Sequence, residues 1–380
     1  MIAKTFFGFE EILATELKNL GAQEVEQGVR MVRFVGDKGF MYKANLGLRT
    51  ALKILKPIYF FKAKTENDLY KGISGVNWSK LLNANQTFVI DATVHSDHFN
   101  HSEFVSQKCK DAIVDQFRER TGQRPSIDKA FPDLRINIHI DKDQVSVALD
   151  SSGNSLHQRG YRTATNIAPI NEVLAAGILL LSGWDGQTDF LDPMCGSGTF
   201  LTEAAMIACQ IPANINRKEF AFEKWNDWDN ELFDQISGSL LKKVREFHHT
   251  IKGFDKAPSA VQKAIDNIKN ANLDDYISVE ENNFFESQKT VEGKLHLVFN
   301  PPYNERLSIE METFYANIGD TLKKNYPGTA AWFITANLEA LKFVGLKPSR
   351  KIKLFNASLE SRLVKFDMYE GSKRTKFQTH

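Results

Sequence analysis

The sequence predicts an α/β fold in which a mostly parallel sheet holds a ligand at the carboxyl ends of its strands. The first observation is FLDPMCGSGTFLTEAA at residues 190–205, where an apolar strand leads through a glycine-rich turn into an alanine-rich helix. The second is LHLVFNPPYNER at residues 295–306, another apolar strand that ends in two prolines. Ligands of open α/β sheets bind at this edge, so we expect the two stretches to form one site.

Length and composition indicate a globular protein of two or three domains. The chain has 380 residues, of which 42% are hydrophobic and 25% charged, as in ordinary globular proteins. It has no run of about eighteen apolar residues and no secretory signal, so we expect a cytoplasmic protein without a membrane partner. Cys109, Cys195 and Cys209 lack metal-type spacing, which predicts no metal site. The net charge of +1 neither supports nor excludes RNA as a partner.

The first 150 residues predict two small α/β units. Residues 1–55 contain an amphipathic helix that ends at Gly21 and the alternating strand VRMVRFVG. The second unit combines a helix, a strand, a long helix at about 103–121 and a hairpin of two alternating strands. Basic residues of the long helix and the turn after it could contact RNA phosphates, or acidic neighbours could neutralise them on a solvated face. These candidates are Lys108, Lys110, Arg118, Arg120, Arg124 and Lys129.

Residues 153–168 predict a polar linker to a larger domain at 169–380. Arg159 and Arg162 in this linker either contact RNA or connect the domains. An apolar helix follows, with Pro169 near its start, where a missing N–H costs nothing. The domain also contains an aromatic segment that either stacks a nucleobase or packs as an insertion, which is the more common outcome. Its aromatic residues are Phe220, Phe222, Trp225 and Trp228.

Further strands complete the predicted sheet. One strand ends at Asp255, and an acidic residue at this place can accept both hydroxyls of a ribose. A third strand ends at Asn283 and Phe284, and Asn283 can both donate and accept hydrogen bonds. After the strand TAAWFITAN, two alternating strands around Asn356 predict a terminal hairpin.

The glycine-rich turn suits a closely bound ligand, because glycine has no Cβ to keep the backbone away. Asp192, at the end of the strand, can hold an amine or hydroxyl groups. The turn is neither a dinucleotide fingerprint nor a P-loop, since it lacks a third glycine and a following Lys-Ser or Lys-Thr pair. The alternative is an ordinary βα turn with Thr199 as the helix cap.

These motifs resemble those of a known family. DPMCGSG followed by NPPY resembles the S-adenosylmethionine-dependent methyltransferases that modify nucleobase amines. GISGVNW, KDAIVDQFRER and PDLRINIHIDKDQVSVALDSSGNSLHQRGYR resemble a THUMP domain, which is an RNA-binding module. Together with APINEVLAA and NPPYNERL, the entire chain resembles the bacterial guanine-N2 methyltransferases of 23S ribosomal RNA, whose members are often labelled N6-adenine-specific DNA methylases.

The resemblance implies a Rossmann-like methyltransferase domain whose parallel sheet ends in an antiparallel hairpin. It also implies a ferredoxin-like unit at 1–55 and a THUMP domain at 56–152. The implied cofactor is S-adenosyl-L-methionine, and the implied partner is 23S rRNA or a ribosomal assembly intermediate. The implied cofactor-binding residues are Thr165, Pro169, Asp192, Met194, Cys195, Gly196, Ser197, Gly198, Thr199, Asp255, Lys256, Asn283, Phe284 and Asn300. The implied catalytic residues are Asn300, Pro301, Pro302 and Tyr303.

These catalytic residues suit methylation of an amine whose lone pair is delocalised into a ring. The Asn300 side-chain oxygen and the Pro301 carbonyl can accept the amine hydrogens, and consecutive prolines hold the backbone rigid. Tyr303 can lie against a base that has left its stack. A rival mechanism uses Cys195 as a nucleophile. Asn304 departs from the family, which usually has Gly at this position, so its side chain would narrow the pocket or add a contact to the base.

Four other functions remain open. One is a tRNA guanine-N2 methyltransferase, which shares the THUMP-like and NPPY-type parts. Others are DNA or RNA adenine-N6 methyltransferases, although a DNA enzyme would have no use for the first 150 residues. The fourth is an RNA-binding assembly factor whose methyltransferase fold is inert. Longer members of the family carry a second methyltransferase domain, and we expect this chain to match their first.

Overall fold

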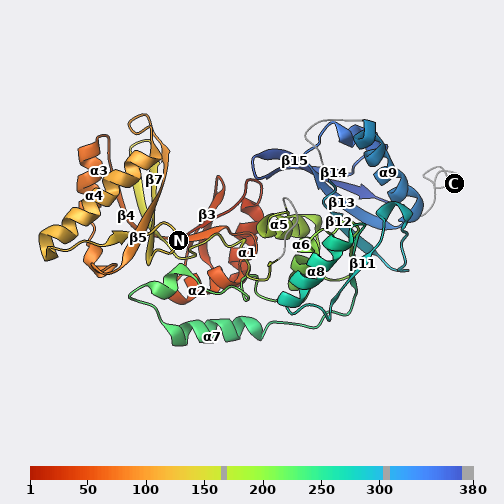
Figure 1. Cartoon of the computed structure of the whole chain (residues 1–380), viewed down its shortest axis with the longest axis horizontal. Helices are drawn as coiled ribbons and strands as arrows, with labels where there is room; N and C mark the ends of the chain where they lie inside the picture. The colour runs from red at the N-terminus through yellow and green to blue at the C-terminus, as the bar shows by residue number, and fades with distance from the viewer. Residues whose placement is uncertain (164–168, 303–308, 370–380) are drawn as a thin grey trace.

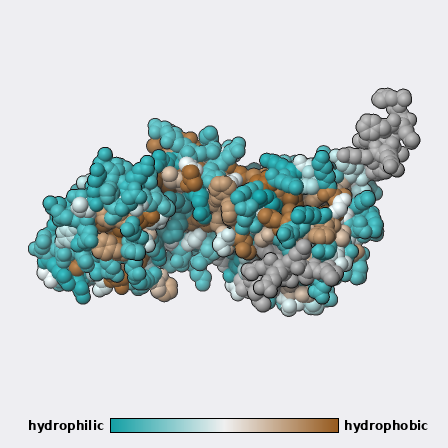
Figure 2. Space-filling model, turned by 90° about the horizontal axis from the view of Figure 1, so that it is seen from above, coloured by the Kyte–Doolittle hydropathy of each residue, from teal (hydrophilic) through white to brown (hydrophobic). Residues whose placement is uncertain are grey.

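The computed structural model describes residues 1–163, 169–302 and 309–369. An N-terminal half built on one sheet is joined to a C-terminal domain built on a second sheet (Figure 1). Figure 2 shows a mostly hydrophilic surface interrupted by hydrophobic patches on both halves. Within the described ranges, no helix combines the length and apolar character needed to cross a membrane.

The N-terminal sheet is continuous and has the strand order β2-β3-β1-β4-β8-β7-β5-β6. The predicted boundary between residues 55 and 56 falls inside β4, which pairs with β1 on one side and β8 on the other. The ferredoxin-like and THUMP-like units therefore share one sheet. Its strands are β1 (Ile2–Lys4), β2 (Gln23–Gly28), β3 (Met31–Val35), β4 (Lys53–Lys62), β5 (Thr87–His95), β6 (Ser126–Ile127), β7 (Leu134–Asp141) and β8 (Gln144–Asp150).

Helices cover one face of this sheet and leave the other face open. In β7, Ile136, Ile138 and Ile140 are buried in the core with residues of the helices, whereas the alternate residues are only partly buried. This alternation is the one predicted for a strand with one packed face. The helical segments are α1 (Glu10–Leu20), α2 (Lys38–Gly47), α3 (Glu66–Ser74), η1 (Trp78–Lys80) and α4 (Ser102–Thr121).

The C-terminal sheet has the order β11-β10-β9-β12-β13-β15-β14. The first five strands in this order are parallel, and β15 pairs antiparallel with both β13 and β14. The predicted parallel sheet with a terminal antiparallel hairpin is confirmed. Its strands are β9 (Asp189–Asp192), β10 (Ile251–Asp255), β11 (Ile277–Glu281), β12 (Leu295–Phe299), β13 (Thr329–Thr335), β14 (Arg350–Asn356) and β15 (Leu359–Asp367).

Helices pack on both faces of the C-terminal sheet. One apolar core joins the sheet to α5 (Glu172–Ser182), α6 (Thr199–Ala208) and α8 (Pro258–Asn270). A second core joins its other face to α9 (Ile309–Asn325), which the sequence analysis did not predict. The short helices η3 (Phe284–Glu286) and η4 (Ala340–Val344) contribute to this second core.

An insertion between β9 and β10 reaches back to the N-terminal half. It contains η2 (Ala221–Lys224) and α7 (Asn230–Leu241), which lies below α2 in Figure 1. Phe222 is buried, and its ring lies 4.6 Å from that of Tyr42 on α2. Phe220 and Trp225 are buried in the same core. The packing interpretation of these aromatics is confirmed, and they are not free to stack on a base.

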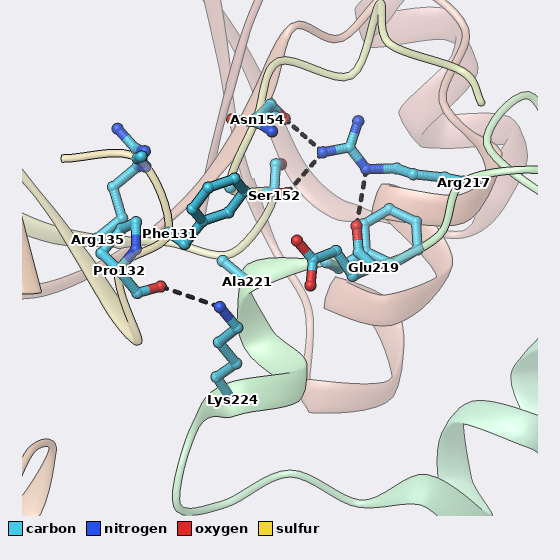
Figure 3. A pocket seen from close by; sticks show the side chains of 12 residues that line it. Phe131, Pro132, Arg135, Ser152, Asn154, Arg217, Glu219, Ala221 and Lys224 are labelled. Carbon is cyan, nitrogen blue, oxygen red and sulfur yellow. Dashed lines mark hydrogen bonds between the residues drawn. The ribbon is translucent and has the colours of Figure 1, made fainter. Parts of the chain in front are cut away.

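The insertion also holds the start of the linker. Arg217 donates to the main-chain carbonyls of Ser152 at 3.1 Å, Asn154 at 2.7 Å and Glu219 at 3.0 Å (Figure 3). Lys224 lies next to the loop before β7 and donates to the Pro132 carbonyl at 3.4 Å. The insertion is therefore bound to the N-terminal half by side-chain hydrogen bonds to main-chain carbonyls in addition to apolar packing.

Candidate functional site

Both predicted motifs lie at one edge of the C-terminal sheet. Asp192 ends β9 and Asn300 follows β12, and these strands are parallel neighbours. The order of strands reverses here, because β10 and β11 lie beyond β9 whereas β13 lies beyond β12. Such a switch point opens a crevice at the carboxyl ends of the strands. Asp192 and Asn300 both line a cavity of about 690 Å³ at this edge.

Most of the predicted cofactor-binding and catalytic residues line this cavity. The cavity's size is within the range of small-molecule sites. Thr165, Tyr303 and the unusual Asn304 lie outside the described residues. The predicted residues that line the cavity are Pro169, Asp192, Met194, Cys195, Gly196, Ser197, Thr199, Asp255, Lys256, Asn283, Phe284, Asn300, Pro301 and Pro302.

Gly198 and Thr199 lie at the start of α6. Gly198 does not line the cavity. Its φ is +80°, and a Cβ on it would lie 3.1 Å from the Cβ of Ala264 on α8, so this glycine permits close packing between helices. Gly198 also occupies the N-cap position of α6, which corrects the alternative that Thr199 caps the helix. Thr199 instead accepts a hydrogen bond from Arg162 at 2.7 Å.

Two carboxylates lie at the base of the cavity. Asp255 accepts hydrogen bonds from the backbone N–H groups of Gly196 at 3.0 Å and Ala257 at 2.9 Å, which ties β10 to the glycine-rich turn. Asp192 is almost fully buried and accepts one from the N–H of Met194 at 3.1 Å. Burial and then the negative charge of Asp255 raise the pKa of Asp192 well above its usual value. The pair therefore favours a cationic or strongly donating ligand group beside it.

Asn300 provides an unpaired acceptor at the opposite side of the switch point. Its side-chain oxygen is buried and accepts no hydrogen bond from any residue that the structure describes. A buried acceptor left in this state costs about 1–3 kcal/mol. Pro301 and Pro302 line the cavity next to it and have no N–H that could satisfy this oxygen. The site thus fits a ligand that carries an N–H donor.

Aromatic rings form another wall of the cavity. Phe285 and Phe314 meet edge to face with 5.2 Å between ring centroids. Asn283 accepts from the N–H of Phe285 and donates to Glu286 at 2.7 Å, so its amide is already engaged, and the adenine contact predicted for it stays a prediction. Sequence reasoning missed Ile170, Pro193, Phe200, Asn282, Phe285 and Phe314 as lining residues.

Two of these omissions have identifiable causes. Phe285 adjoins the predicted Phe284, so the aromatic pair after β11 was a usable signal. Phe314 comes from α9, and no signal for its position was available without that helix.

Cys195 does not have the environment of a nucleophile. Its side chain is buried, and burial, Asp192 and Asp255 raise the pKa of the thiol well above its usual value. The thiolate is the reactive form of cysteine, so these surroundings disfavour the rival mechanism. In the described part of the chain, no group of three or more potential metal ligands is gathered.

The predicted RNA-binding residues on α4 are largely paired with acidic neighbours. Lys108 lies 3.6 Å from Glu66, Lys110 lies 2.9 Å from Asp111, and Arg118 lies 3.4 Å from Asp115. Arg120 donates to the side-chain oxygen of Asn77. These contacts support the alternative of a neutralised helix face. Arg124 and Lys129 are exposed in the segment after α4.

Arg159 is structural rather than RNA-contacting, which corrects the RNA role predicted for it, whereas the RNA contact predicted for Arg162 stays a prediction. Arg159 is fully buried, 3.4 Å from Glu203, and donates to Asn214 and to the carbonyl of Arg49 in the N-terminal half. Arg162 lies 3.2 Å from Glu172. Because the guanidinium of Arg159 has no exposed surface, a phosphate cannot reach it.

Three family models match successive parts of the chain. The family model described as "RMKL-like, methyltransferase domain" matches residues 159–365. A THUMP domain model matches residues 63–150, and a model of the RlmL ferredoxin-like domain matches residues 1–55. The first of these matches alone covers more than half of the chain.

Relatives and solved structures match over nearly the entire chain. "Ribosomal RNA large subunit methyltransferase K/L" of Syntrophotalea carbinolica is 38% identical in an alignment that covers 96% of this chain and 53% of that protein. The chain thus spans about half the length of this relative. A Synechocystis protein named as an RNA methyltransferase is 35% identical, with 95% of each chain covered.

The architecture of both halves recurs in a crystal structure of a methyltransferase complexed with SAH. It superimposes with a TM-score of 0.86 at 30% identity, and the match covers 98% of each chain. The similarity therefore includes the N-terminal sheet and the domain that carries the cavity. From the family models, the relatives and this likeness, we conclude that the chain belongs to the RMKL-like methyltransferase family.

Proposed function

We propose that this chain transfers a methyl group from S-adenosylmethionine to the exocyclic N2 amine of a guanine in 23S rRNA. Residues 169–380 would carry out the transfer, and residues 1–152 would bind the RNA. The observation that carries the proposal is the single cavity lined by Asp192, at the end of β9, and Asn300, after β12. The rRNA methyltransferase name of a relative with 38% identity supports the choice of substrate.

The first side of the cavity suits the cofactor. When bound, S-adenosylmethionine supplies an electrophilic methyl group on a positively charged sulfur. Asp192 and the glycine-rich turn would hold its methionine part, since the buried carboxyl group and residues of that turn line the same cavity. Asp255 would accept the ribose hydroxyls with the lone pairs left free by its two backbone hydrogen bonds. Phe285 would pack against the adenine ring.

The second side of the cavity suits the target amine. The Asn300 oxygen has no partner in the described structure, so it can accept an amine hydrogen without first losing another bond. With the Pro301 carbonyl as a second acceptor, the amine would turn its lone pair toward the methyl group. Both acceptors would also stabilise the positive charge that develops on nitrogen. Geometry contributes most, because the transfer requires an in-line approach.

The proposal is tested by incubating the purified chain with labelled S-adenosylmethionine and unmodified 23S rRNA transcribed in vitro. We expect N2-methylguanosine in the digested RNA by mass spectrometry. Bulk tRNA in a parallel reaction tests the tRNA alternative, and N6-methyladenosine as the product would contradict the choice of base. Calorimetry that detects no binding of S-adenosylmethionine would instead favour an inert assembly factor.

The role of Asn300 is tested by Asn300→Ala. We expect transfer to fall at least about a thousandfold, since both positioning and charge stabilisation are lost. The affinity for S-adenosylmethionine should stay within a few-fold, because the cofactor contacts lie on the β9 side of the cavity. Wild-type turnover in this variant would contradict the assignment.

A further inference from the structure

The open face of the N-terminal sheet carries a group of basic side chains. In the β1–β3 pairing Ile2 lies opposite Arg33 and Lys4 opposite Met31, so Lys4 and Arg33 share one face. Ala3 between them points into the buried core on the helix-covered face. Lys4 and Arg33 are thus on the side that no helix of the N-terminal half covers.

Histidines from β5 and β7 approach these two residues. The rings of His95 and His139 lie 5.9 Å apart, and His139 alternates with the buried residues Ile138 and Ile140. Arg30, in the turn before β3, is the fifth member. We call these residues the strand-face cluster: Lys4, Arg30, Arg33, His95 and His139. It draws on both the ferredoxin-like and the THUMP-like units, which share the sheet through β4.

The charges of the strand-face cluster act on one another. Burial and the charges of Lys4, His95 and Arg33 lower the pKa of His139, and Asp141 opposes them. Burial and the charges of Arg33 and Arg30 lower the pKa of Lys4. The residues of the two units are therefore within electrostatic range across the open face. Like charges held together in this way destabilise the protein unless an anion offsets them.

No acidic side chain in the described chain forms an ion pair with these cations. Among the residues described, no side chain of the strand-face cluster takes part in an ion pair or a hydrogen bond. Glu26 lies opposite Arg33 in the β2–β3 pairing without forming an ion pair. On α4, in contrast, Lys108 and Arg118 each have an acidic partner. Lys4, Arg30 and Arg33 are thus available to an external anion, whereas Lys108 and Arg118 on the long helix are already paired.

An exposed aromatic ring adjoins the strand-face cluster. Phe60 on β4 lies opposite Ser146 on β8, which lies opposite His139 on β7, so the three side chains share the open face. The side chain of Phe60 is 67% exposed. Two strand spacings of about 4.8 Å separate it from His139, a distance that one nucleotide can span. Exposed rings next to cations are the arrangement by which proteins bind unpaired bases and their phosphates.

We propose that the strand-face cluster binds phosphate groups of the RNA substrate, while Phe60 stacks on an unpaired base beside them. This inference rests on the proposed function in that it takes RNA as the substrate, and it specifies where the N-terminal half contacts that RNA. A helix face would present its cations along one line. The open face and the turn before β3 present the charged groups of Lys4, Arg33 and Arg30, together with two imidazoles and a stacking ring.

The test compares two charge-matched variants of the full chain. Lys4→Gln with Arg33→Gln removes two charges of the strand-face cluster, and Lys108→Gln with Arg118→Gln removes two paired charges on α4. We measure the affinity for poly(U) and for 23S rRNA by fluorescence anisotropy at several salt concentrations. Poly(U) is included because phosphate contacts carry no sequence information, so this arm tests the cluster whichever RNA is methylated.

We expect the variant of the strand-face cluster to bind both RNAs about tenfold more weakly. The slope of log affinity against log salt for poly(U) should fall by about 1.4, since each lost contact to a single strand contributes about 0.7. The α4 variant should bind within about twofold of wild type. Phe60→Leu should weaken binding of poly(U) without changing its salt slope, because stacking releases no counter-ions.

Several outcomes would overturn the inference. Unchanged poly(U) binding in the variant of the strand-face cluster, or a larger loss in the α4 variant, would do so. The inference would also be overturned if the strand-face cluster of the wild-type protein binds inorganic phosphate at millimolar concentration but removal of its charges leaves the affinity for RNA unchanged. Arg33→Lys keeps the charge and should restore most of the affinity, which separates charge loss from misfolding. The proposed function fails separately, if the wild-type chain methylates no guanine in 23S rRNA.

Discussion

At the scale of single residues, several ionisable and polar groups near the cavity are buried with polar atoms that have no hydrogen-bond partner in the described structure. The Asn300 oxygen and the second carboxylate oxygen of Glu172 have no hydrogen-bond partner among the described residues. Glu172 also lies 3.2 Å from Arg162, whose guanidinium holds Thr199 at the edge of the cavity. Such groups cost stability, and here they adjoin the residues proposed to hold the cofactor.

Glu172 should make the stability of the protein depend on pH. Burial raises its pKa from 4.5 to about 7, so the folded chain binds this proton more tightly than the unfolded chain. The stabilisation is fully present below about pH 4.5 and is lost as the pH rises through about 7. The change is about 3 kcal/mol at most.

The measurement compares the melting temperature of wild type and Glu172→Gln between pH 4.5 and 8. The variant should lack the decline that Glu172 causes in wild type, so the difference between the two curves should change across this range. His296, with a pKa lowered to about 4 by burial, has the opposite dependence but is present in both proteins. Parallel curves would contradict the prediction.

Cys195→Ala tests the rejected nucleophile. The buried thiol is held in its neutral form by its surroundings, so methyl transfer should stay within about twofold of wild type. The small cavity created should lower the free energy of unfolding by about 1 kcal/mol. Loss of transfer with intact binding of S-adenosylmethionine would restore the cysteine mechanism.

At the scale of elements, the cavity depends on how closely β10 approaches the glycine-rich turn and α6. A Cβ on Gly253 of β10 would lie 2.3 Å from the Cδ1 of Leu201 and 3.2 Å from the Sγ of Cys195. Leu201 is fully buried in the core between α6 and the sheet, so it has little room to move. This glycine lets the strand that carries Asp255 approach the turn that carries Gly196.

Gly253→Ala should therefore disturb the cavity. We expect a loss of about 1–3 kcal/mol in the free energy of unfolding from overpacking, and weaker binding of S-adenosylmethionine as the turn shifts. Urea unfolding and calorimetry measure the two effects. Gly238→Ala on α7 is the matched control, since its Cβ would meet open space and the change should stabilise the helix by up to about 1 kcal/mol. Equal effects of both variants would refute the role of the close approach.

At the scale of the whole molecule, a buried polar network joins the two halves. Arg159 and Glu203 form an ion pair with no exposed side-chain surface, and Arg159 also donates to the carbonyl of Arg49. Arg49 donates to the carbonyls of Met206 and Ile211 in the C-terminal half. Because these contacts cross between the domains, the N-terminal sheet is held in a set position relative to the cavity.

Arg159→Met should destabilise the protein without changing its affinity for RNA. The uncompensated charge of Glu203 should cost about 3–5 kcal/mol, measured by urea unfolding. RNA affinity at low temperature should stay within about twofold of wild type, because Arg159 is buried. Arg124→Met on the surface is the control and should change stability by about 0.5 kcal/mol or less. A selective loss of RNA affinity in Arg159→Met would reinstate its predicted RNA contact.

Local patterns were sufficient to predict many of the helices and strands and one edge of the cavity. Apolar strands before Asp192 and Asn300 were readable, because a buried parallel strand requires a continuous apolar run. The helix at 102–121 and the hairpin of β7 and β8 were likewise predicted within a residue or two. The patterns did not reveal α9, whose Phe314 completes the aromatic wall.

Residue type and spacing by themselves therefore determined the fold class, the family resemblance and the glycine-rich and NPPY segments of the site. Only the tertiary structure decided which arginines are accessible, since burial of Arg159 and pairing of Lys108 depend on residues distant in sequence. It also showed that β4 joins two units into one sheet, which brings Lys4 within electrostatic range of His139. The charge of a residue can be read from the sequence, whereas its neighbours in space and its exposure to solvent depend on the folded chain.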